Sequence, residues 1–346
     1  MDPARALSQW NLTQALQSAP EEGLINHTWV VGDPPDAILQ WVNPIFSPEI
    51  HQDIQQVTTH LARRGLVTPR LLETPGGDLC VIDTDGCWRL QSYVIGSTVN
   101  AFSSTSQAAS AAALVGRFHA ALADLDMAFP HQRKHAHDTP AHMRNLQAAL
   151  TLADAHPLGS RVMPVGKKIL EAWQAWDGPL QLPERICHGD LKVSNIRMST
   201  DSRRAVCLID LDTLGHLPYS VELGDAWRSW CNPAPEDDFD NVRFDLEIFK
   251  ATATAWLQEA PALSPLERDS LVPGIERICL ELAARFCADA LQNTYFREET
   301  DRYPERGAHN LARARTQLAL ATAALDRRGD CNAIVSSTGS LAPQAG

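Results

Sequence analysis

Two short segments of the chain bring carboxylates and an amide together at close spacing. Asp190 and Asn195 lie five residues apart in the segment from Ile186 to Ile196, and Asp210 follows fifteen residues later in an apolar run that we expect to be a strand. A carboxylate can accept the proton of an attacking hydroxyl, while an amide oxygen and a second carboxylate can hold Mg²⁺ against phosphates. We therefore expect Asp190 to be a catalytic base and Asn195 and Asp210 to be metal ligands.

The order of these three groups is that of the catalytic loop and the metal-binding segment of protein kinases. Here Gly189 follows the histidine of the loop, and the second segment reads Asp210-Leu211-Asp212. This variant resembles the aminoglycoside phosphotransferase family of small-molecule kinases. The alternative is a surface turn followed by a buried strand with unrelated carboxylates. The match of three positions in order and spacing favours the catalytic interpretation.

The positive charge that usually accompanies such a site is missing from its expected place. The third strand of kinases carries a lysine in the pattern Val-Ala-Ile-Lys, whereas this chain has Gln40 there. The sequence holds only five lysines, and none precedes Lys134. Gln40 can donate a hydrogen bond to a nucleotide but supplies no charge, so we expect Lys192, two residues after Asp190, to act as the catalytic cation. The missing lysine also leaves open a catalytically inactive pseudokinase that only binds a nucleotide or a partner.

The pattern of residues 1–97 predicts a small, mainly antiparallel β lobe. Hydrophobic spacing and turn residues indicate a short helix over 4–18, then strand, strand, helix, strand and strand over 22–31, 36–42, 48–64, 79–83 and 88–95. That order is typical of a kinase N-lobe that covers a nucleotide. The last strand leads into a hinge, where backbone groups near Ser92 to Val94 could pair with an adenine edge.

The rest of the chain predicts a larger helical lobe over residues 98–328. Helical patterns cover roughly 106–125, 141–154, 163–177, 241–258 and most of 264–328. We interpret Asp225 as the cap of a further helix that braces the catalytic loop through buried hydrogen bonds. Residues 329–346 are small and polar, which predicts a disordered tail. The fold class that follows is α+β, a protein-kinase-like fold of two lobes.

Composition disfavours several classes of partner. The formal net charge is −12, which argues against nucleic acid and anionic membranes. The eight cysteines include no Cys-x-x-Cys pair, so we interpret them as reduced thiols rather than disulfides or a zinc site. The chain begins without a secretory signal and contains no apolar span of about 18 residues, which makes the cytoplasm the expected location. The oligomeric state cannot be inferred from these features.

Further segments extend the resemblance to one branch of the family, the bacterial N-acetylhexosamine 1-kinases. The matching segments are Gly23-Leu-Ile-Asn-His-Thr28, Ile38-Leu-Gln40 with Asn43, His137-Asp-Thr-Pro140, Ile209-Asp-Leu-Asp-Thr213, Leu223-Gly-Asp-Ala226 with Arg228, Glu236-Asp237, Tyr295-Phe296 and His309-Asn-Leu311 with Arg313-Ala-Arg-Thr-Gln317. That branch also has glutamine in the third strand. Two departures are Trp41, where the branch often has arginine, and Val193-Ser194, which is closer to the wider family.

The resemblance implies ATP and Mg²⁺ as cofactors and a small-molecule sugar as substrate. The sugar would be a hexose or N-acetylhexosamine, phosphorylated at its anomeric hydroxyl, with Asp190, Arg285 and Tyr295 against it. An aminoglycoside or an amino alcohol is the alternative acceptor. Acidic residues near the pocket would favour such a cationic substrate, whereas Arg285 and Tyr295 suit a neutral sugar better.

Overall fold

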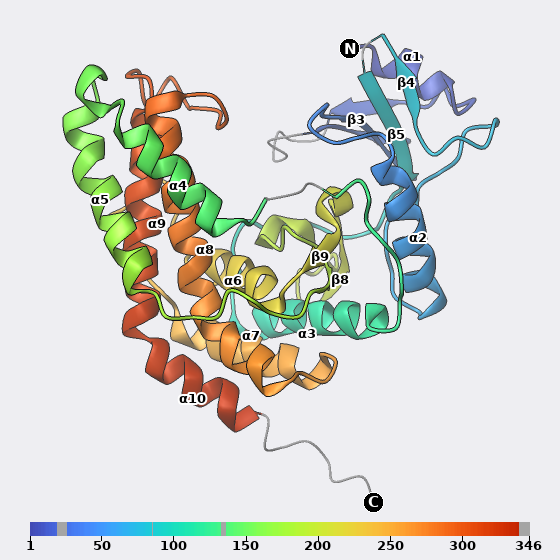
Figure 1. The fold of residues 1–346 in the computed structure, drawn as a ribbon. Helices are drawn as coiled ribbons and strands as arrows, with labels where there is room; N and C mark the ends of the chain where they lie inside the picture. The colour runs from blue at the N-terminus through green and yellow to red at the C-terminus, as the bar shows by residue number, and fades with distance from the viewer. Residues whose placement is uncertain (19–25, 85, 133–135, 339–346) are drawn as a thin grey trace, which may run out of the picture.

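The computed structural model describes residues 1–18, 26–84, 86–132 and 136–338. They form two lobes, a small one built on an antiparallel sheet and a larger one built mainly of helices (Figure 1). The sheet lobe holds the N-terminus, and the helical lobe occupies the rest of the view. This is the α+β, two-lobe architecture expected from the sequence.

Five strands form the sheet of the small lobe, in the order β1-β2-β3-β5-β4 with every neighbouring pair antiparallel. Their bounds are Leu16–Ser18 (β1), His27–Val31 (β2), Ala37–Val42 (β3), Val81–Asp83 (β4) and Gly86–Ser92 (β5). Helix α2 (Ile50–Arg63) lies between β3 and β4 in sequence. Its Ile50, Ile54, Val57 and Leu61 are buried and share a cluster with Val42 and Cys87 of the sheet. The apolar spacing of this segment therefore predicted both the helix and its buried face.

The first segment differs from the helix expected over residues 4–18. Helix α1 (Pro3–Ser8) is short, and Leu16–Ser18 pair with β2 at the edge of the sheet. Asn11 has a left-handed backbone with φ of 56°, which breaks the helical path. Leu7 and Trp10 bury against the sheet, so the apolar spacing here reflects the packing of a single helical turn and not of a long helix.

The large lobe contains eight helices among the residues described, and α8 is at its centre. Their bounds are Thr105–Leu122 (α3), Thr139–Leu150 (α4), Gly159–Ala175 (α5), Tyr219–Trp230 (α6), Leu246–Glu259 (α7), Pro265–Gln292 (α8), Ala308–Asp326 (α9) and Arg328–Thr338 (α10). Helix α8 packs against α4, α5, α6 and α9. It approaches α6 at two glycines, because a Cβ at Gly224 would lie 2.4 Å from the carbonyl oxygen of Gly274. This contact fixes α6, which lies behind the catalytic segment.

The tail expected to be disordered is partly a helix. Helix α10 buries Cys331 and Val335 and packs against α7 and α8. At its start Arg328 is paired with Glu276 of α8 and with Asp177. The prediction of disorder is therefore wrong for residues 329–338. The segment has few apolar residues, so its helix could not be recognised without the surface of α7 and α8 against which it packs. Residues 339–346 lie outside the described part of the chain.

The two lobes are joined by residues 93–104. Ser97 and Met198 exchange two backbone hydrogen bonds of 2.9 and 2.8 Å, so the connection is fastened to the hairpin of the large lobe that follows the catalytic loop. Gly96, with φ of 148°, comes so close to this hairpin that a Cβ there would lie 2.0 Å from the Met198 carbonyl oxygen. A glycine is therefore required where the chain crosses between the lobes. Within the described residues, we find no helix that combines the length and apolarity of a membrane span.

Candidate active site

Two short antiparallel ribbons position the catalytic segment. Strand β6 (Arg185–Cys187) pairs with β9 (Gly215–Leu217), and β7 (Ile196–Met198) pairs with β8 (Ala205–Leu208). The loop between β6 and β7 carries Asp190 and Asn195, and Asp210 follows β8. The backbone N–H of Ile209 donates to the Asn195 carbonyl at 2.9 Å, and His188 Nε2 lies 2.9 Å from the Ile209 carbonyl. These bonds hold the two predicted segments side by side.

Asp190 lies between a cation and an amide. Lys192 Nζ is 2.9 Å from its Oδ2, and Asn195 Nδ2 donates to the same oxygen at 2.9 Å. Burial alone would raise the pKa of Asp190, but the charge and hydrogen bond of Lys192, together with His188 and Asn195, outweigh it and hold the pKa below its ordinary value. The carboxylate is therefore ionised at neutral pH and able to accept a proton. The charged form of Lys192 is stabilised in turn, because Asp190 and Asp210 raise the pKa of its ammonium group against the opposing effect of burial.

Asn195 and Asp210 have the donor chemistry of a magnesium site. The Asn195 amide nitrogen faces Asp190, which leaves its amide oxygen as the ligand atom. Asp210 has a left-handed backbone with φ of 64°, a strained conformation for a residue other than glycine. Burial and the neighbouring Asp212 carboxylate raise the pKa of Asp210 to about 6. A bound cation would relieve this repulsion, so a carboxylate and an amide oxygen fit Mg²⁺ at this place.

Asp212 is held by the other lobe. Arg89 of β5 pairs with both of its oxygens, and Asn26 Nδ2 donates to Oδ2 at 2.6 Å. Only 2% of the Arg89 side chain and 1% of the Asp212 side chain are exposed. Burial raises the pKa of Asp212, but the charge and hydrogen bonds of Arg89, together with the hydrogen bond from Asn26, exceed that effect and lower the pKa overall. With both oxygens engaged, Asp212 is a structural partner of the small lobe, and the role of Asp210 as a metal ligand stays a prediction.

Sequence reasoning missed Arg89 as the buried cation of the small lobe. The kinase pattern predicts the cation of this lobe as a lysine on the third strand, and because Gln40 stands there the charge was assigned to Lys192 of the other lobe. The signal was nevertheless present, because Arg89 lies in an apolar strand, between Trp88 and Leu90, and a buried arginine requires a carboxylate partner. In the sheet Arg89 is the register partner of Gln40 on β3.

Gln40, predicted to contact the nucleotide, is held within the sheet. Its Oε1 accepts from Arg89 Nε at 2.9 Å and from Gln91 Nε2 at 2.8 Å, and its Nε2 donates to Thr28 Oγ1 at 3.0 Å. Gln40 therefore positions Arg89. Its contact with a nucleotide stays a prediction.

The expected hinge is already bonded at both predicted positions. The Ser92 N–H donates to the Arg70 carbonyl at 2.8 Å, and the Val94 carbonyl accepts from Arg197 Nε at 3.0 Å. Arg197 also reaches the Tyr93 hydroxyl. The Ser92 amide is thus not available to an adenine edge in this conformation, and the adenine contact near Ser92 and Val94 stays a prediction.

The residue that braces the catalytic loop is Glu222 and not Asp225. The Glu222 carboxylate accepts the backbone N–H groups of His188 and Gly189, each at 2.8 Å, from the first turn of α6. Asp225 lies inside α6, where it accepts from Arg228 at 2.8 and 3.0 Å. The expectation failed because the helix begins at Tyr219, earlier than the sequence pattern indicated, so that Asp225 is no cap.

A cationic and aromatic cluster on α8 and the following loop contains both predicted acceptor residues. The Arg285 guanidinium lies 5.5 Å from the centroid of the Tyr295 ring and 5.5 Å from that of Phe296. The last turns of α8 are thus in contact with the loop that follows the helix. Their contact with a substrate stays a prediction.

The acidic groups around this cluster already have positive or hydrogen-bonding partners. Glu281 accepts from Thr139 at 2.6 Å and lies 3.0 Å from His137 and 3.9 Å from Arg285. Asp289 accepts three backbone N–H groups, those of Thr294, Tyr295 and Phe296, and the side chain of Asn310. Asp225 is paired with Arg228, and it also influences the pKa of both Lys192 and His137. This shared influence connects the catalytic loop electrostatically with the α8 cluster.

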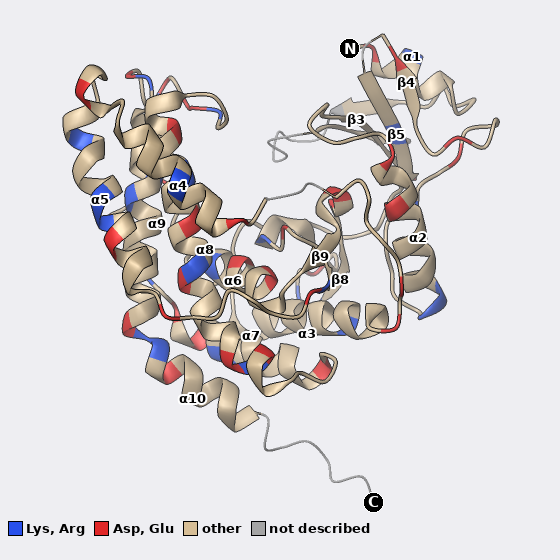
Figure 2. Ribbon diagram, viewed as in Figure 1, with Lys and Arg blue, Asp and Glu red and all other residues tan. Residues whose placement is uncertain are grey.

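Most lysine and arginine residues lie in the large lobe, which also carries most of the acidic residues. Figure 2 shows lysine and arginine residues on helices such as α4, α5 and α8, while the strands of the small lobe carry few charges.

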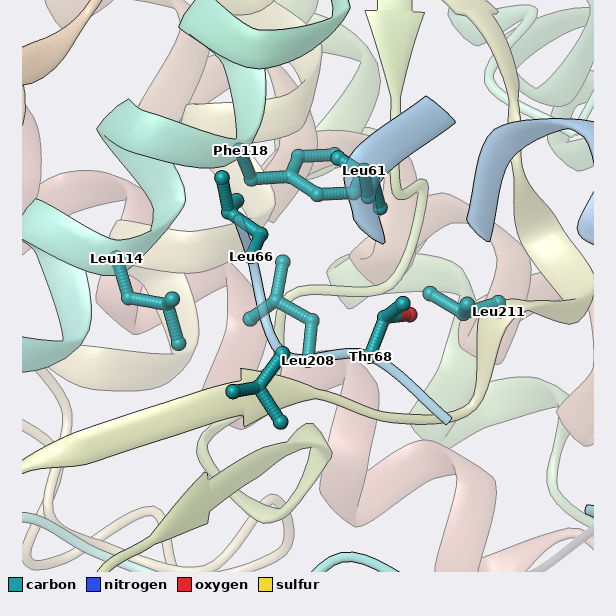
Figure 3. Close-up of a pocket in the computed structure, with 8 residues that line it drawn as sticks. Leu61, Leu66, Thr68, Leu114, Phe118, Leu208 and Leu211 are labelled. Atoms are coloured by element: carbon teal, nitrogen blue, oxygen red, sulfur yellow. The ribbon is translucent and has the colours of Figure 1, made fainter. Parts of the chain in front are cut away.

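The apolar cavity shown in Figure 3 lies beside the Asp210 segment, where α2, α3 and β8 meet. It is lined by Leu61, Leu66, Val67, Thr68, Leu114, Phe118, Leu208 and Leu211. Its volume of about 10 Å³ is no larger than a single water requires, so it is a packing seam between the lobes and not a substrate site.

Comparison with known proteins defines the class. Residues 17–262, more than two thirds of the chain, match the model of the phosphotransferase enzyme family. The fold resembles a microcompartment-associated aminopropanol kinase, with a TM-score of 0.61, 16% identity and coverage of 94% of this chain and 97% of that one. It also resembles an aminoglycoside phosphotransferase from Alicyclobacillus acidocaldarius, with a TM-score of 0.58, 15% identity and coverage of 95% and 97%. The amicoumacin kinase hAmiN, solved with AMP-PNP and Ca²⁺, gives a TM-score of 0.59 at 13% identity, covering 88% and 87%.

These structures share a kinase-like fold with the chain, and at such identities the likeness concerns the fold alone. The match to the family model shows membership of a family and not only a shared fold, and it includes the catalytic loop and the Asp210 segment. The protein belongs to the phosphotransferase enzyme family.

Proposed function

We propose that this protein is an ATP-dependent kinase that phosphorylates a neutral sugar, a hexose or N-acetylhexosamine, at its anomeric hydroxyl. The observation that carries the choice of acceptor is the stack of Arg285 on Tyr295 and Phe296, next to acids that are already paired. An ammonium substrate needs an acidic group to neutralise it, whereas a sugar needs donors and a ring face. The sequence resemblance to N-acetylhexosamine 1-kinases supports the same acceptor.

Asp190 is the base in this proposal. Its Oδ2 is bonded to Lys192 and Asn195, which fixes the orientation of the carboxylate. The acceptor hydroxyl would donate its proton to this carboxylate as the oxygen attacks phosphorus. Lys192, 2.9 Å from Asp190, offers positive charge to the transferring phosphoryl group.

Asn195 and Asp210 would hold Mg²⁺, which supplies neutralisation of the β- and γ-phosphate charge when bound with ATP. Around them, this chain contributes a fixed frame. Arg89 and Asn26 keep Asp212 away from the ion site, and Glu222 holds the turn before Asp190.

The decisive experiment is a screen of acceptors with ATP and Mg²⁺, in which ADP release is measured for hexoses, N-acetylhexosamines, amino alcohols and aminoglycosides. The product of the preferred sugar should carry phosphate on C1, be labile to mild acid and no longer act as a reducing sugar. A phosphate on C6, or a preference for aminopropanol, ethanolamine or an aminoglycoside, would contradict the sugar 1-kinase and leave the kinase in place. Absence of ATP turnover with every acceptor would favour the pseudokinase.

A variant of Arg285 tests the acceptor side separately. Arg285→Ala should raise the KM for the sugar by about tenfold, the scale of one lost charged hydrogen bond, and leave the KM for ATP nearly unchanged. Arg285→Lys is the matched control, because it keeps the charge but loses the planar group that stacks on Tyr295. An equal effect of Arg285→Ala on both KM values would contradict the assignment of Arg285 to the acceptor.

A further inference from the structure

A cluster of soft ligands lies in the small lobe, apart from the phosphotransfer site. His51 of α2, Cys80 just before β4 and Cys87 of β5 each offer one ligand atom, and these atoms lie within 4.8 Å of one another. His51 is distant in sequence from the two cysteines, and a turn separates Cys80 from Cys87. The three residues therefore form no Cys-x-x-Cys motif. All eight cysteines of the chain are free thiols.

The His51 ring is prepared as a ligand. Its Nδ1 lies 2.6 Å from the Pro48 carbonyl oxygen, which can only accept, so Nδ1 carries the hydrogen. Nε2 then presents a lone pair, and it is buried with no hydrogen-bond partner among the described residues. The whole residue is 1% exposed. A ring held by a backbone carbonyl through one nitrogen is the usual state of a metal-binding histidine, and an orphaned buried nitrogen is costly unless something binds it.

We propose that His51, Cys80 and Cys87 bind one thiophilic divalent cation of the Zn²⁺ class, which fastens α2 to the β4–β5 hairpin. Zn²⁺ lies about 2.0–2.3 Å from nitrogen and sulfur ligands, so its ligand atoms are roughly 3.5–3.8 Å apart. Because the three atoms lie within 4.8 Å of one another, they would need to close by at most about 1 Å. A disulfide between the two cysteines would need a separation of about 2 Å, which is shorter than the spacing of two sulfur ligands on one ion.

The exposure of the two thiols agrees with this geometry. Cys80 is partly exposed while Cys87 is buried, which provides an entry path for an ion. Binding replaces S–H by S–metal bonds and releases up to two protons. A water molecule would complete the coordination, as at other zinc sites with three protein ligands.

A second group of three ligand types in the chain shows the opposite state. His119, Cys187 and Glu222 also lie close together, but both nitrogens of His119 are engaged, with Trp256 and with Glu222. Glu222 accepts the two loop amides described above, and the Cys187 thiol donates to the Leu217 carbonyl. That group is satisfied by hydrogen bonds, so it serves as an internal control.

The site would act at a distance from catalysis through β5. Cys87 lies two residues before Arg89, whose pairing with Asp212 connects the sheet to the metal-binding segment. A cation that joins α2 to this hairpin would stiffen the strand that carries Arg89. Bound metal should therefore stabilise the fold in addition to any effect on turnover.

The test uses the full chain, reduced and treated with a chelator, titrated with Co²⁺ as a spectroscopic substitute for Zn²⁺. We expect one equivalent of Co²⁺ to give thiolate-to-metal charge-transfer absorption, Zn²⁺ to abolish that absorption, and excess Mg²⁺ to leave it in place. Zn²⁺ should also raise the Tm. Cys80→Ser, at a partly exposed position that tolerates change, should lose both the absorption and the Tm shift, whereas Cys187→Ser should keep both.

Three outcomes would overturn the proposal. The first is a wild-type protein without thiolate-to-metal absorption. The second is retention of that absorption in Cys80→Ser together with its loss in Cys187→Ser. The third is recovery of a Cys80–Cys87 disulfide by mass spectrometry from protein that binds no metal. None of these readouts depends on the acceptor, so the proposal and the kinase assignment fail or stand separately.

Discussion

Asp190 owes its ionised state to its immediate neighbours. Burial raises the pKa of a carboxyl, and Lys192 at 2.9 Å, together with His188 and Asn195, more than offsets that effect. Asn195 fixes the same oxygen, so the side chain has little freedom. These contacts suit a group that must receive a proton from a hydroxyl placed beside it.

Asp190→Asn should therefore cut kcat by roughly 10²-fold or more, the usual contribution of a general base, while nucleotide binding and Tm change little. The isosteric amide preserves the shape of the loop. Measurement of kcat by ADP release, with nucleotide affinity by calorimetry, checks the assignment. Turnover close to that of the wild type would remove Asp190 from the role of base.

Arg89, Asp212 and Asn26 form the main polar connection between the strands of the small lobe and the segment after β8. The pair is almost completely buried, and removal of one partner of such a pair leaves an uncompensated charge that costs about 3–5 kcal/mol. Within the described part of the chain we find no ion pair of this kind for Asp210, whose charged form is disfavoured by burial and by Asp212. Two carboxylates only two residues apart therefore have different environments.

Asp212→Ala should lower the free energy of unfolding by about 3–5 kcal/mol. Asp210→Ala should abolish Mg²⁺-dependent turnover with little loss of stability. Urea unfolding and ADP release measured on both variants separate the two effects, and Arg89→Met should match Asp212→Ala in stability. The reverse ranking, with Asp210→Ala the unstable variant, would move the metal role to Asp212.

The segment before α4 is fixed to α8 by an ion pair. His137 Nδ1 lies 3.0 Å from Glu281, and Arg277 donates to Thr139 and to the His137 carbonyl. Burial opposes protonation of His137, but Glu281 exceeds that effect and raises the pKa of the imidazole above its ordinary value. A raised histidine pKa stabilises the folded state fully below the unfolded pKa, near 6.5, and this contribution is lost as pH rises through the folded pKa.

The Tm of the wild type should consequently fall as pH rises above about 6.5, and His137→Asn should lack this part of the decline. The difference in Tm between the two proteins should be largest at pH 6 and shrink at pH 8 and above. His142→Asn is the control, because burial lowers the pKa of His142 and its protonation has the opposite sign. Parallel pH profiles for the wild type and His137→Asn would contradict the ion pair.

At the scale of the whole molecule, α10 closes the large lobe from below in the view of Figure 1. Cys331 and Val335 are buried against α7 and α8, and Arg328 reaches Glu276 and Asp177. Arg268 Nη1 also donates to the Val335 carbonyl. Helix α10 therefore covers apolar surface of two other helices.

Truncation after Arg327 should destabilise the protein by several kcal/mol, since burial of each such apolar side chain contributes about 1.5–3 kcal/mol. Truncation after Thr338 removes none of the contacts described here and should have a much smaller effect. Thermal unfolding of the two truncated chains gives the comparison. Equal Tm values would show that α10 adds nothing to the stability of the large lobe.

The chemistry of the catalytic loop could be predicted from the sequence because it is local. Asp190, Lys192 and Asn195 lie within six residues, so one turn of backbone is enough to bring them together. The same is true of α2, whose buried face follows directly from the spacing of Ile50, Ile54 and Val57. Periodicity and short spacing hold this information, whereas the assignment of Arg285 and Tyr295 to the acceptor rests on the family resemblance and stays a prediction.

What the tertiary structure decided are the pairings between distant segments. Arg89 and Asp212 are 123 residues apart, and Glu222 lies 34 residues after His188, whose backbone N–H donates a hydrogen bond to it. The helix of residues 328–338 and the cluster of His51, Cys80 and Cys87 likewise depend on surfaces that come together only in the fold. A buried charge must find its partner wherever the chain brings one, and sequence spacing does not encode that distance. The sequence thus determined which groups could do the chemistry, and the packing of the two lobes decided that the Asp212 carboxylate pairs with Arg89 of the small lobe.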